Sequence, residues 1–449
     1  MKRVPLNIVA ALIVLMIVAM IFFGWIVMET ERGVRDMGKI GRLFRDLAKI
    51  PASIKHAFVE TASHPGLALE QRFGTVAGFK QIDPDFVDDG YLLLSRVNGD
   101  LDSPQVELLR ISDNKVLHTW RPDIDHINSL SKLKSRFVKL ARDKHSGRYR
   151  MVHPFLTNDG GLIFQDDSPL VKINVCSEPE WTIDGVFHHG LERAADGNYW
   201  IPGTIEPSSL DNKLLKRHRD DSIVQVSPEG EILFNKSVAQ ILIDNDHQGV
   251  VYGVAPYESD ILHLNEVQPA LFDGSLWKRG DLLISLRYRS MVFLYRPSSN
   301  KILWMSIGPW LNQHDPDFLN PEEISVFSNE SYRPVMKGAQ KMFNAHNEVY
   351  IMNLSSQSVR KPYTAGLKKF ELRTISEGRA RILGNRDVYI EESNHGRLLR
   401  LSESGDLRWQ FINRASDGKT YKLGWTRYLS NADLLPVINR LNTVNCGDK

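Results

Sequence analysis

Cysteine is scarce in this chain, and several motifs that commonly mark an enzyme are missing. The 449 residues contain two cysteines, Cys176 and Cys446, far apart and without a metal-ligand spacing. A disulfide framework is therefore excluded, whereas a single disulfide stays open. No P-loop, GxSxG, HExxH or CxxC sequence occurs. These absences remove the strong sequence evidence for nucleotide hydrolysis, serine hydrolysis and common zinc sites.

A surplus of one charge is also missing. Lys and Arg total 56 and Asp and Glu total 54, so no global field favours a nucleic-acid partner. A pocket for an anion would have to be local. The composition does not determine the oligomeric state, and a homodimer is one possibility.

One long apolar run stands near the amino terminus. Residues 8–28 are uncharged and long enough to cross ~30 Å of hydrocarbon as a helix. Lys2 and Arg3 precede the run and no A-x-A-like cleavage site follows it, so we predict that residues 1–28 form an uncleaved signal anchor. The short amino-terminal tail favours an extracytoplasmic, for example periplasmic, location for the bulk of the chain. A domain that faces the cytoplasm is the alternative.

Basic residues just beyond the run weaken the positive-inside argument for this orientation. They are Arg32, Arg35, Lys39, Arg42 and Arg45. Residues 29–85 are predicted to form a stalk, because apolar residues recur in the first part at three- and four-residue spacing. These residues are Val34, Met37, Ile40, Leu43, Phe44 and Leu47. Pro51 is expected to end or kink this helix.

The rest of the chain, residues 86–449, repeats one unit of short strands and turns. The instances are 90–120, 160–183, 197–238, 280–307, 348–383 and 386–412. Tryptophans fall at matching points in four of them, Trp120, Trp181, Trp304 and Trp409. Repeats of this size predict an all-β fold, a six-bladed β-propeller, with no long helical segment after the stalk. Function would then lie in the loops and strand ends that meet at the central channel.

Histidines precede or follow several of these units. His188 and His189 stand before the third unit, His263 before the fourth and His314 after it, while Arg287 follows a strand of the fourth. A neutral imidazole can act as a nucleophile, and the planar guanidinium of an arginine matches a tetrahedral oxyanion. This set suits transfer of a sulfuryl or phosphoryl group without a metal.

Three other interpretations of these residues stay open. Each histidine can be a structural or exposed residue, because that is common near strand ends. Arg287 and Arg289 can lie on a solvated strand edge. His189, His263 and His314 can also form a metal site, although an arginine nearby would repel a cation.

Longer sequence matches carry a family resemblance. The run GDLLISLRYRSMVFLYRP with KILWMSIG, QHDPDF and ISVFSN, preceded by DILHLNEV, resembles the core of the PAPS-independent arylsulfotransferase family. HHGLERAADGNYW resembles that family's His-His-Asp…Asn-Gly-Asn segment. The resemblance implies a six-bladed propeller that moves a sulfuryl group from an aryl sulfate donor to a hydroxyl acceptor. The family's transfer is ping-pong through a sulfohistidine and uses no nucleotide or other cofactor.

The resemblance also implies roles for single residues. His314, in Gln313-His314-Asp315, matches the nucleophile, and His263 matches the histidine that assists the phenol oxygen. Arg287 matches the arginine that holds the sulfuryl oxygens.

The remaining candidates complete the expected site. His189 matches the third histidine, with His188 as the neighbour that could replace it. Asn265 is expected to position His263, and Arg289 is a further candidate for binding substrate.

This chain departs from the family pattern at two positions of the matched segments. Gly190 stands where an Asp is expected after the histidine pair, and Ser328 replaces the Asp before Asn329. The amino-terminal sandwich domain of some members is absent, and a single anchor takes its place. We therefore predict a membrane-anchored sulfotransferase, with a non-catalytic propeller that binds anions or partners as the alternative.

Overall fold

The structure is a computed structural model that describes residues 5–32, 37–62, 65–210, 218–253, 259–334 and 340–446. The chain divides into two compact units, Met1–Pro65 and Gly66–Lys449. The predicted boundary between residues 85 and 86 is therefore wrong. The reason is that β1 (Gly78–Gln81) pairs with a strand of the second unit, from Gly78 opposite Ile412 to Gln81 opposite Trp409.

The first unit consists of two helices, α1 (Leu6–Arg32) and α2 (Gly38–Ala62). Within α1, Leu6–Thr30 is long and apolar enough to cross a membrane, and none of its most apolar window is buried by protein. The predicted effect of Pro51 as a helix end is wrong, because α2 continues through it to Ala62. Val34 and Arg35, two residues of the stalk prediction, lie outside the described residues.

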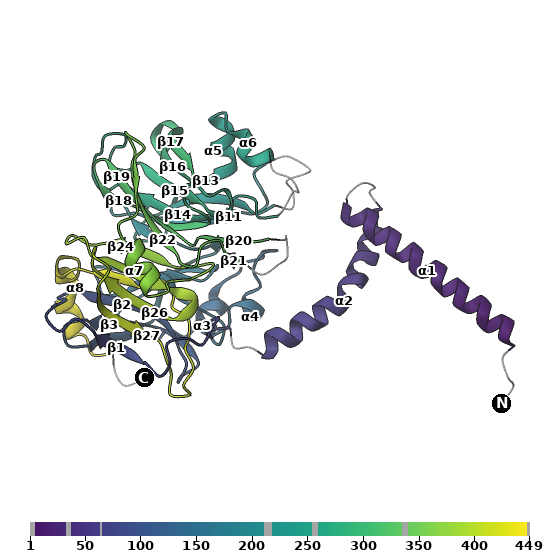
Figure 1. Cartoon of the computed structure of the whole chain (residues 1–449), viewed down its shortest axis with the longest axis horizontal. Helices are drawn as coiled ribbons and strands as arrows, with labels where there is room; N and C mark the ends of the chain where they lie inside the picture. Colours follow the sequence, from purple (N-terminus) through teal and green to yellow (C-terminus); the bar gives the residue numbers. More distant parts are fainter. Residues whose placement is uncertain are drawn as a thin grey trace. The chain divides into compact units, whose positions relative to one another are not determined.

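The second unit is a six-bladed β-propeller, as predicted (Figure 1). Each blade is one antiparallel sheet that runs from an innermost strand at the axis to an outer strand at the rim. From the inside outward, blade 1 contains β28 (Arg427–Leu429), β2 (Tyr91–Asn98), β3 (Ser103–Arg110) and β4 (Lys115–Trp120). Blade 2 contains β5 (Val152–Leu156), β6 (Leu162–Gln165), β7 (Leu170–Ile173) and β8 (Pro179–Ile183). Blade 3 contains β9 (Val186–Phe187), β10 (Glu192–Arg193), β11 (Tyr199–Ile205), β12 (Asp220–Val226) and β13 (Ile232–Ser237).

The other three blades follow the same order. Blade 4 contains β14 (Leu264–Pro269), β15 (Leu282–Leu286), β16 (Met291–Arg296) and β17 (Lys301–Ile307). Blade 5 contains β18 (Gln313–Asn320), β19 (Glu323–Ser328), β22 (Glu348–Asn353) and β23 (Val359–Arg360). Blade 6 contains β24 (Arg379–Ile382), β25 (Val388–Glu392), β26 (Arg397–Leu401), β27 (Leu407–Ile412) and the outer strand β1. A separate hairpin joins β20 (Ser331–Tyr332) to β21 (Lys341–Met342).

The predicted repeat units match the three outer strands of most blades, and each blade has a further inner strand. The fifth predicted unit, 348–383, is wrong because β24 at its end belongs to blade 6. The four repeated tryptophans all lie in the fourth strand of a blade, which confirms that their positions are equivalent.

Alternation of side chains along each strand explains the continuous apolar runs. In β15, Leu282, Ile284 and Leu286 pack toward blade 3, whereas Leu283 packs toward blade 5. Successive residues of a strand point to opposite faces, so a strand between two neighbouring blades must be apolar on both. Six buried clusters fill the six interfaces between blades in this way.

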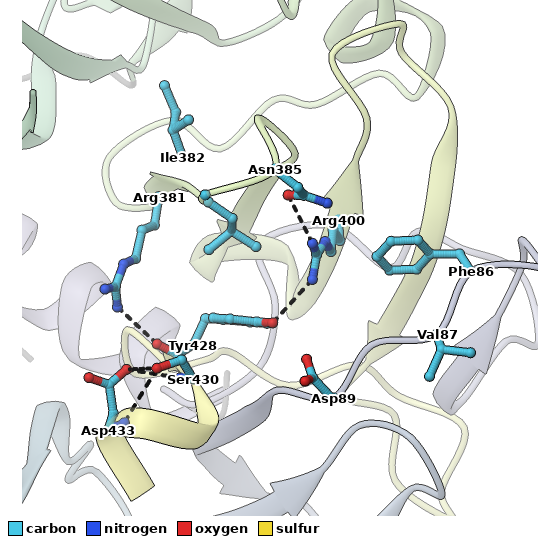
Figure 2. A pocket seen from close by; sticks show the side chains of 12 residues that line it. Phe86, Val87, Asp89, Arg381, Ile382, Asn385, Arg400, Tyr428, Ser430 and Asp433 are labelled. Atoms are coloured by element: carbon cyan, nitrogen blue, oxygen red, sulfur yellow. Dashed lines mark hydrogen bonds between the residues drawn. The ribbon is translucent and has the colours of Figure 1, made fainter.

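Ring closure depends on segments from both ends of the second unit. β28 supplies the innermost strand of blade 1. β1 extends blade 6 beside β27 (Figure 1). Between these blades, Asp88 accepts hydrogen bonds from Arg400, Trp409 and Tyr428. A cavity of 480 Å³ opens beside this group, and Figure 2 shows Arg400 between Asn385 and Tyr428. We call Asp88, Arg400, Trp409 and Tyr428, together with Asp387, the closure junction.

A disulfide joins Cys176 to Cys446, with 5.3 Å between their Cα atoms. It connects the turn between β7 and β8 to the segment that follows α8 (Asn431–Thr443). This resolves the pairing that the sequence left open.

The prediction that no long helix follows the stalk is wrong. α8 packs Leu434, Val437 and Leu441 into the core between blades 1 and 2. The other helices are short and lie in connections: α3 (Ile124–Leu130), α4 (Leu140–Asp143), α5 (Val238–Asp244), α6 (Gln248–Tyr252), α7 (Thr364–Lys369), η1 (Arg287–Arg289), η2 (Pro297–Ser299) and η3 (Ser393–His395).

Candidate functional site

The predicted histidines meet at the innermost strands of three consecutive blades. His189 lies between β9 and β10, His263 directly precedes β14, and His314 is the second residue of β18. The ring centroid of His189 is 5.1 Å from that of His263 and 6.2 Å from that of His314. Together with Arg287, we call these residues the axial cluster. The packing of three neighbouring blades around the axis brings them together.

His314 is fully buried, at 0 % exposure, and one of its ring nitrogens has a fixed partner. Its Nδ1 lies 2.6 Å from Oδ1 of Asn329. The amide nitrogen of Asn329 donates to the carbonyl oxygens of Thr374 and Glu377, both at 3.0 Å, so its oxygen must face the histidine. Nδ1 of His314 therefore carries the hydrogen, and Nε2 keeps a free lone pair. Nε2 has no hydrogen-bond partner in the structure.

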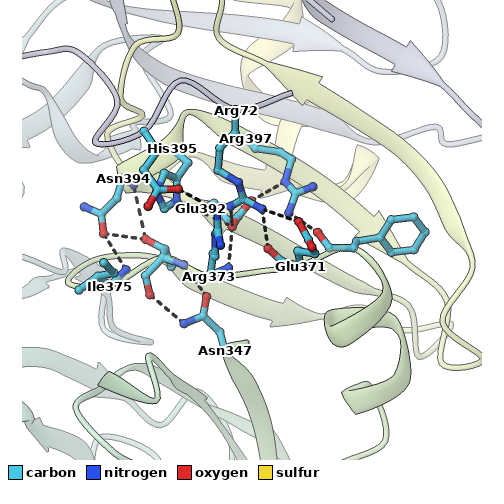
Figure 3. A network of polar contacts seen from close by, with 12 residues as sticks. Arg72, Asn347, Glu371, Arg373, Ile375, Glu392, Asn394, His395 and Arg397 are labelled. Carbon is cyan, nitrogen blue, oxygen red and sulfur yellow. Dashed lines mark hydrogen bonds and ion pairs between the residues drawn. The ribbon is translucent and has the colours of Figure 1, made fainter. Parts of the chain in front are cut away.

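A buried polar network holds the segment that orients Asn329. Asn347 donates to the Thr374 carbonyl at 2.8 Å and accepts from the Thr374 amide at 2.6 Å. Asn394 accepts from the amide of Ile375 at 3.0 Å (Figure 3). The hydroxyl of Thr374 donates to the Glu377 carbonyl at 2.7 Å, so both carbonyls that Asn329 needs are held. The tautomer of His314 therefore depends on side chains well outside the axial cluster.

The same network extends to a buried carboxylate of blade 6. Glu392 is surrounded by donors from the side chains of Arg72 and Arg397 and the backbone amide of Arg373 (Figure 3). Attraction to these arginines outweighs the burial that opposes ionisation, and the pKa of Glu392 is lowered. Arg72 comes from the segment that follows the first unit, and it thereby anchors that segment to blade 6.

His263 has a carboxylate partner and an aromatic neighbour. Its Nδ1 lies 2.6 Å from Oδ2 of Asp260, and its ring stacks on Tyr288 with 4.4 Å between centroids. Burial lowers the pKa of His263, while the negative charge of Asp260 acts in the opposite direction. Among the axial histidines, His263 is the one with an ionised partner for its imidazolium form.

His189 is bonded to the neighbour that was predicted to replace it. Nδ1 of His188 lies 2.8 Å from Nδ1 of His189, and Nε2 of His188 lies 3.3 Å from the carbonyl oxygen of Gly203. If Nε2 of His188 donates to that carbonyl, Nδ1 of His189 donates to His188 and its Nε2 stays unprotonated. Burial lowers the pKa of both rings well below the usual range, so both are neutral at pH 7.

Arg287 is buried, at 2 % exposure, and is only weakly paired. Its guanidinium lies 5.3 Å over the ring of Tyr288 and makes one long hydrogen bond, 3.5 Å, to the carbonyl of Ile375. Its Nε has no hydrogen-bond partner among the described residues. Burial lowers the pKa of His314 well below its usual range, and the charge of Arg287 lowers it further. The positive charge of Arg287 thus disfavours the imidazolium form of His314.

The other two predicted residues have different surroundings. Asn265 donates to the carbonyl oxygen of Gln313 at 2.6 Å, so its hydrogen bond supports the strand of His314 rather than His263. Arg289 donates to the carbonyl oxygen of Val250 in α6 at 3.2 Å.

The structure accounts for the glycine that departs from the family pattern. A Cβ atom on Gly190 would overlap the carboxylate of Glu266, which lies against the glycine. Glu266, from β14, therefore takes the space that an Asp at position 190 would need.

Two residues beside the axial cluster were not predicted. The ring of Trp425 lies 5.8 Å from that of His189 and 5.7 Å from that of His314, and His153 lies 5.8 Å from Trp425 on its other side. The sequence held a signal for His153, because this histidine stands at the start of a short strand that an Asp-Gly turn follows. Trp425 had none, because it reaches the axis only through ring closure.

The described ranges contain no group of three or more His, Cys, Asp or Glu side chains arranged to hold a metal ion. In the axial cluster, Nδ1 of His263 is hydrogen-bonded to Asp260, and Nδ1 of His314 is hydrogen-bonded to Asn329. The arrangement combines neutral imidazole rings with a buried guanidinium that lies over Tyr288 beside His263. Such a set can attack, hold and protonate an anionic ester.

Solved structures similar to this chain share little sequence with it. A protein of unknown function from Bacteroides caccae is 13% identical, covering 76% of this chain and 99% of its own, with a TM-score of 0.48. The Pan2 WD40 domain of Neurospora crassa is 9% identical, covering 83% of this chain and 90% of its own, with a TM-score of 0.40. Virginiamycin B lyase of Staphylococcus aureus is 10% identical, covering 74% of this chain and 88% of its own, with a TM-score of 0.36. At these scores the likenesses are too distant to bear on function.

No curated protein sequence matches the chain at a significant level. The family model of the arylsulfotransferases (ASST), in contrast, matches residues 154–414, which is more than half of the chain. The matched range contains every residue of the axial cluster. The chain belongs to the arylsulfotransferase family.

Proposed function

We propose that this protein transfers a sulfuryl group from an aryl sulfate ester to a phenolic or other hydroxyl acceptor, through a sulfohistidine at His314 and without a nucleotide donor. The observation that carries the proposal is the unpartnered, buried Nε2 of His314, whose lone pair Asn329 leaves free. A neutral, desolvated imidazole is the activated form of this nucleophile.

In the donor step, Nε2 of His314 attacks the sulfur atom. An N–S bond forms, the bond from sulfur to the aryl oxygen breaks, and the electron pair of that bond leaves with the aryloxide. The guanidinium group of Arg287 donates hydrogen bonds to the sulfuryl oxygens, which carry negative charge in the transition state.

His263 handles the proton in this scheme. The protonated form of His263, which its partner Asp260 stabilises, gives a proton to the departing aryloxide and is thereby left neutral. In the acceptor step the direction reverses: His263 takes the proton of the acceptor hydroxyl, whose oxygen attacks sulfur and releases Nε2 of His314. Tyr288, stacked on His263, offers an aromatic surface beside the phenol oxygen.

The proposal is tested with the full-length protein in detergent and a chromogenic aryl sulfate alone. We expect a burst of one phenol per protein molecule and a peptide containing His314 that is heavier by one sulfuryl group. His314→Asn should show neither, while His118→Asn, a change in blade 1, should keep both. A nucleotide sulfate donor should add nothing to the rate.

A burst of wild-type size from His314→Asn would disprove the nucleophile assignment. Stabilisation by sulfate with no transfer to any acceptor would instead favour the non-catalytic, anion-binding function.

We also propose that α1 anchors the protein in a membrane and that the propeller lies on the extracytoplasmic side. The Cys176–Cys446 disulfide supports this side, because disulfides persist in oxidising compartments and are rare in the cytosol. Protease added to intact cells or spheroplasts should digest the propeller. Protection until the membrane is disrupted would place it in the cytoplasm.

A further inference from the structure

The innermost strands share a backbone feature at the propeller axis. At or just before each of them, one residue adopts a left-handed conformation. These residues are His153, His189, His263, Asp315, Gly378 and Trp425, with φ of 47°, 62°, 55°, 49°, 125° and 67°. Such φ values are uncommon for residues other than glycine, and a bulky residue that holds one is strained. In blade 1 the position belongs to Trp425.

Trp425 is the largest side chain at these six positions, and it is buried at 2 % exposure. Its ring contacts histidines of blades 2, 3 and 5, namely His153, His189 and His314, at 5.7–5.8 Å between centroids. An indole that touches three blades lies across the axis. It therefore lies at the level of the axial histidines.

A buried carboxylate, that of Glu391, accepts hydrogen bonds from the strained backbone at Trp425. Glu391, fully buried in β25, accepts the amide of Trp425 at 2.9 Å with one oxygen and the amide of Thr426 at 2.6 Å with the other. Strained conformations persist where the surrounding structure over-determines them, and they gather at functional sites. The carboxylate fixes where the indole stands.

The indole nitrogen of Trp425 is the exception among the fully buried tryptophans. Trp120, Trp277, Trp310 and Trp409 each donate their Nε1–H to a carbonyl or carboxylate oxygen. Nε1 of Trp425 is buried and has no acceptor in the described part of the chain. Leaving a buried donor unpaired is costly unless a ligand supplies the acceptor.

We propose that Trp425 forms the floor of the transfer site and that its indole Nε1–H donates a hydrogen bond to an oxygen of the bound sulfuryl group. The inference rests on the proposed function and adds a neutral donor to the charged one of Arg287.

The test compares Trp425→Phe with Trp277→Phe in the full-length protein. Both changes remove one buried indole N–H, and only the first lies at the axis. Two readouts are used: turnover with an aryl sulfate and a phenol, and the rise of the unfolding temperature with inorganic sulfate. We expect Trp425→Phe to lower kcat by about tenfold to a hundredfold, the value of one hydrogen bond to a charged group. The KM for the phenol should stay unchanged, because the N–H contacts the sulfuryl group.

Sulfate should stabilise wild type and Trp277→Phe more than Trp425→Phe. Trp425→His, which retains a ring N–H, should recover part of both signals, and it replaces Trp425→Phe if that variant does not fold. Wild-type turnover and wild-type sulfate stabilisation in the Phe variant would overturn the proposal. If wild type transfers nothing while its sulfate stabilisation still depends on Trp425, the proposed function fails and the donor role stands.

Discussion

The closure junction and the axial cluster are two buried polar groups of one propeller, and they differ in how many of their polar atoms are paired. Arg400 bonds to Asp88, Asp387, Asn385 and Tyr428. Arg287, equally buried, makes one long bond to a carbonyl.

The two tryptophans of these regions differ in the same way. Trp409 donates to Asp88 at 2.7 Å, whereas Trp425 has no acceptor in the described structure. Buried charges that are already paired have no free hydrogen-bonding group for a ligand, and removal of one partner of such a pair lowers the stability of the fold. Buried donors and lone pairs without a partner lower stability unless a bound ligand pairs with them. Several such groups in one place therefore indicate a ligand-binding site. The comparison therefore predicts opposite consequences for equivalent substitutions.

The largest effect is expected for Arg287→Leu. Loss of a charged donor to the sulfuryl oxygens should lower kcat/KM by about 10³-fold. The free energy of unfolding should not fall, because a weakly paired buried charge is removed. Steady-state assays and urea unfolding of the same preparation check both. A destabilised variant with normal kcat/KM would make Arg287 a structural residue.

Arg400→Leu should show the reverse pattern. It leaves Asp88 and Asp387 buried without their cation, which should lower the free energy of unfolding by about 3 kcal/mol. The kcat of the folded fraction should stay at the wild-type value. A loss of kcat without a loss of stability would contradict the structural role of the closure junction.

Trp409→Phe and Trp425→Phe remove the same atoms from two buried sites. Trp409→Phe breaks a hydrogen bond to a carboxylate, so its loss of unfolding free energy should exceed that of Trp425→Phe by about 1.5–3 kcal/mol. Chemical unfolding of both variants measures the difference. Equal losses would mean that the indole N–H of Trp425 has a partner.

The smallest effect concerns pH. Burial keeps His314 neutral in the folded protein, whereas the unfolded chain protonates it below pH ~6.5. As the pH falls below that value, the unfolded chain binds a proton at His314 that the folded protein does not bind. The free energy of unfolding therefore decreases. His314→Asn should make the decline between about pH 6.5 and 5 shallower by up to about 1.4 kcal/mol per pH unit. Trp277→Phe, which removes no titrating group, should keep the wild-type slope.

Much of the fold could be predicted from the sequence, because the apolar runs of the strands must be buried on both faces. The runs around Leu282 and Phe293 indicated strands, and the tryptophans marked equivalent strands in four blades. The inner strands were harder to identify. Those of blades 3 and 5 contain polar residues such as Glu192 and Asp317, so their sequences give no apolar pattern.

The candidate site was predictable in part. His189, His263, Arg287 and His314 were identified through chemistry and family resemblance. The structure brings the three histidine rings together, and Arg287 lies over Tyr288, which stacks on His263. Asn265 was assigned to His263, but its hydrogen bond goes to the carbonyl before His314. Spacing along a strand cannot show which neighbouring strand a side chain reaches.

By itself the sequence determined the apolar helix at the amino terminus, the repeated strands and the residue types of the axial cluster, because these follow from local composition and period. Tertiary structure alone decided that Trp425 meets His314, that Asn329 fixes its tautomer and that Cys176 pairs with Cys446. Each of these contacts joins a blade to a segment distant in sequence or to a neighbouring strand. The contact of Trp425 with His314 exists because the blades close into a ring, whereas that of Asn329 with His314 depends on the pairing of two strands within blade 5.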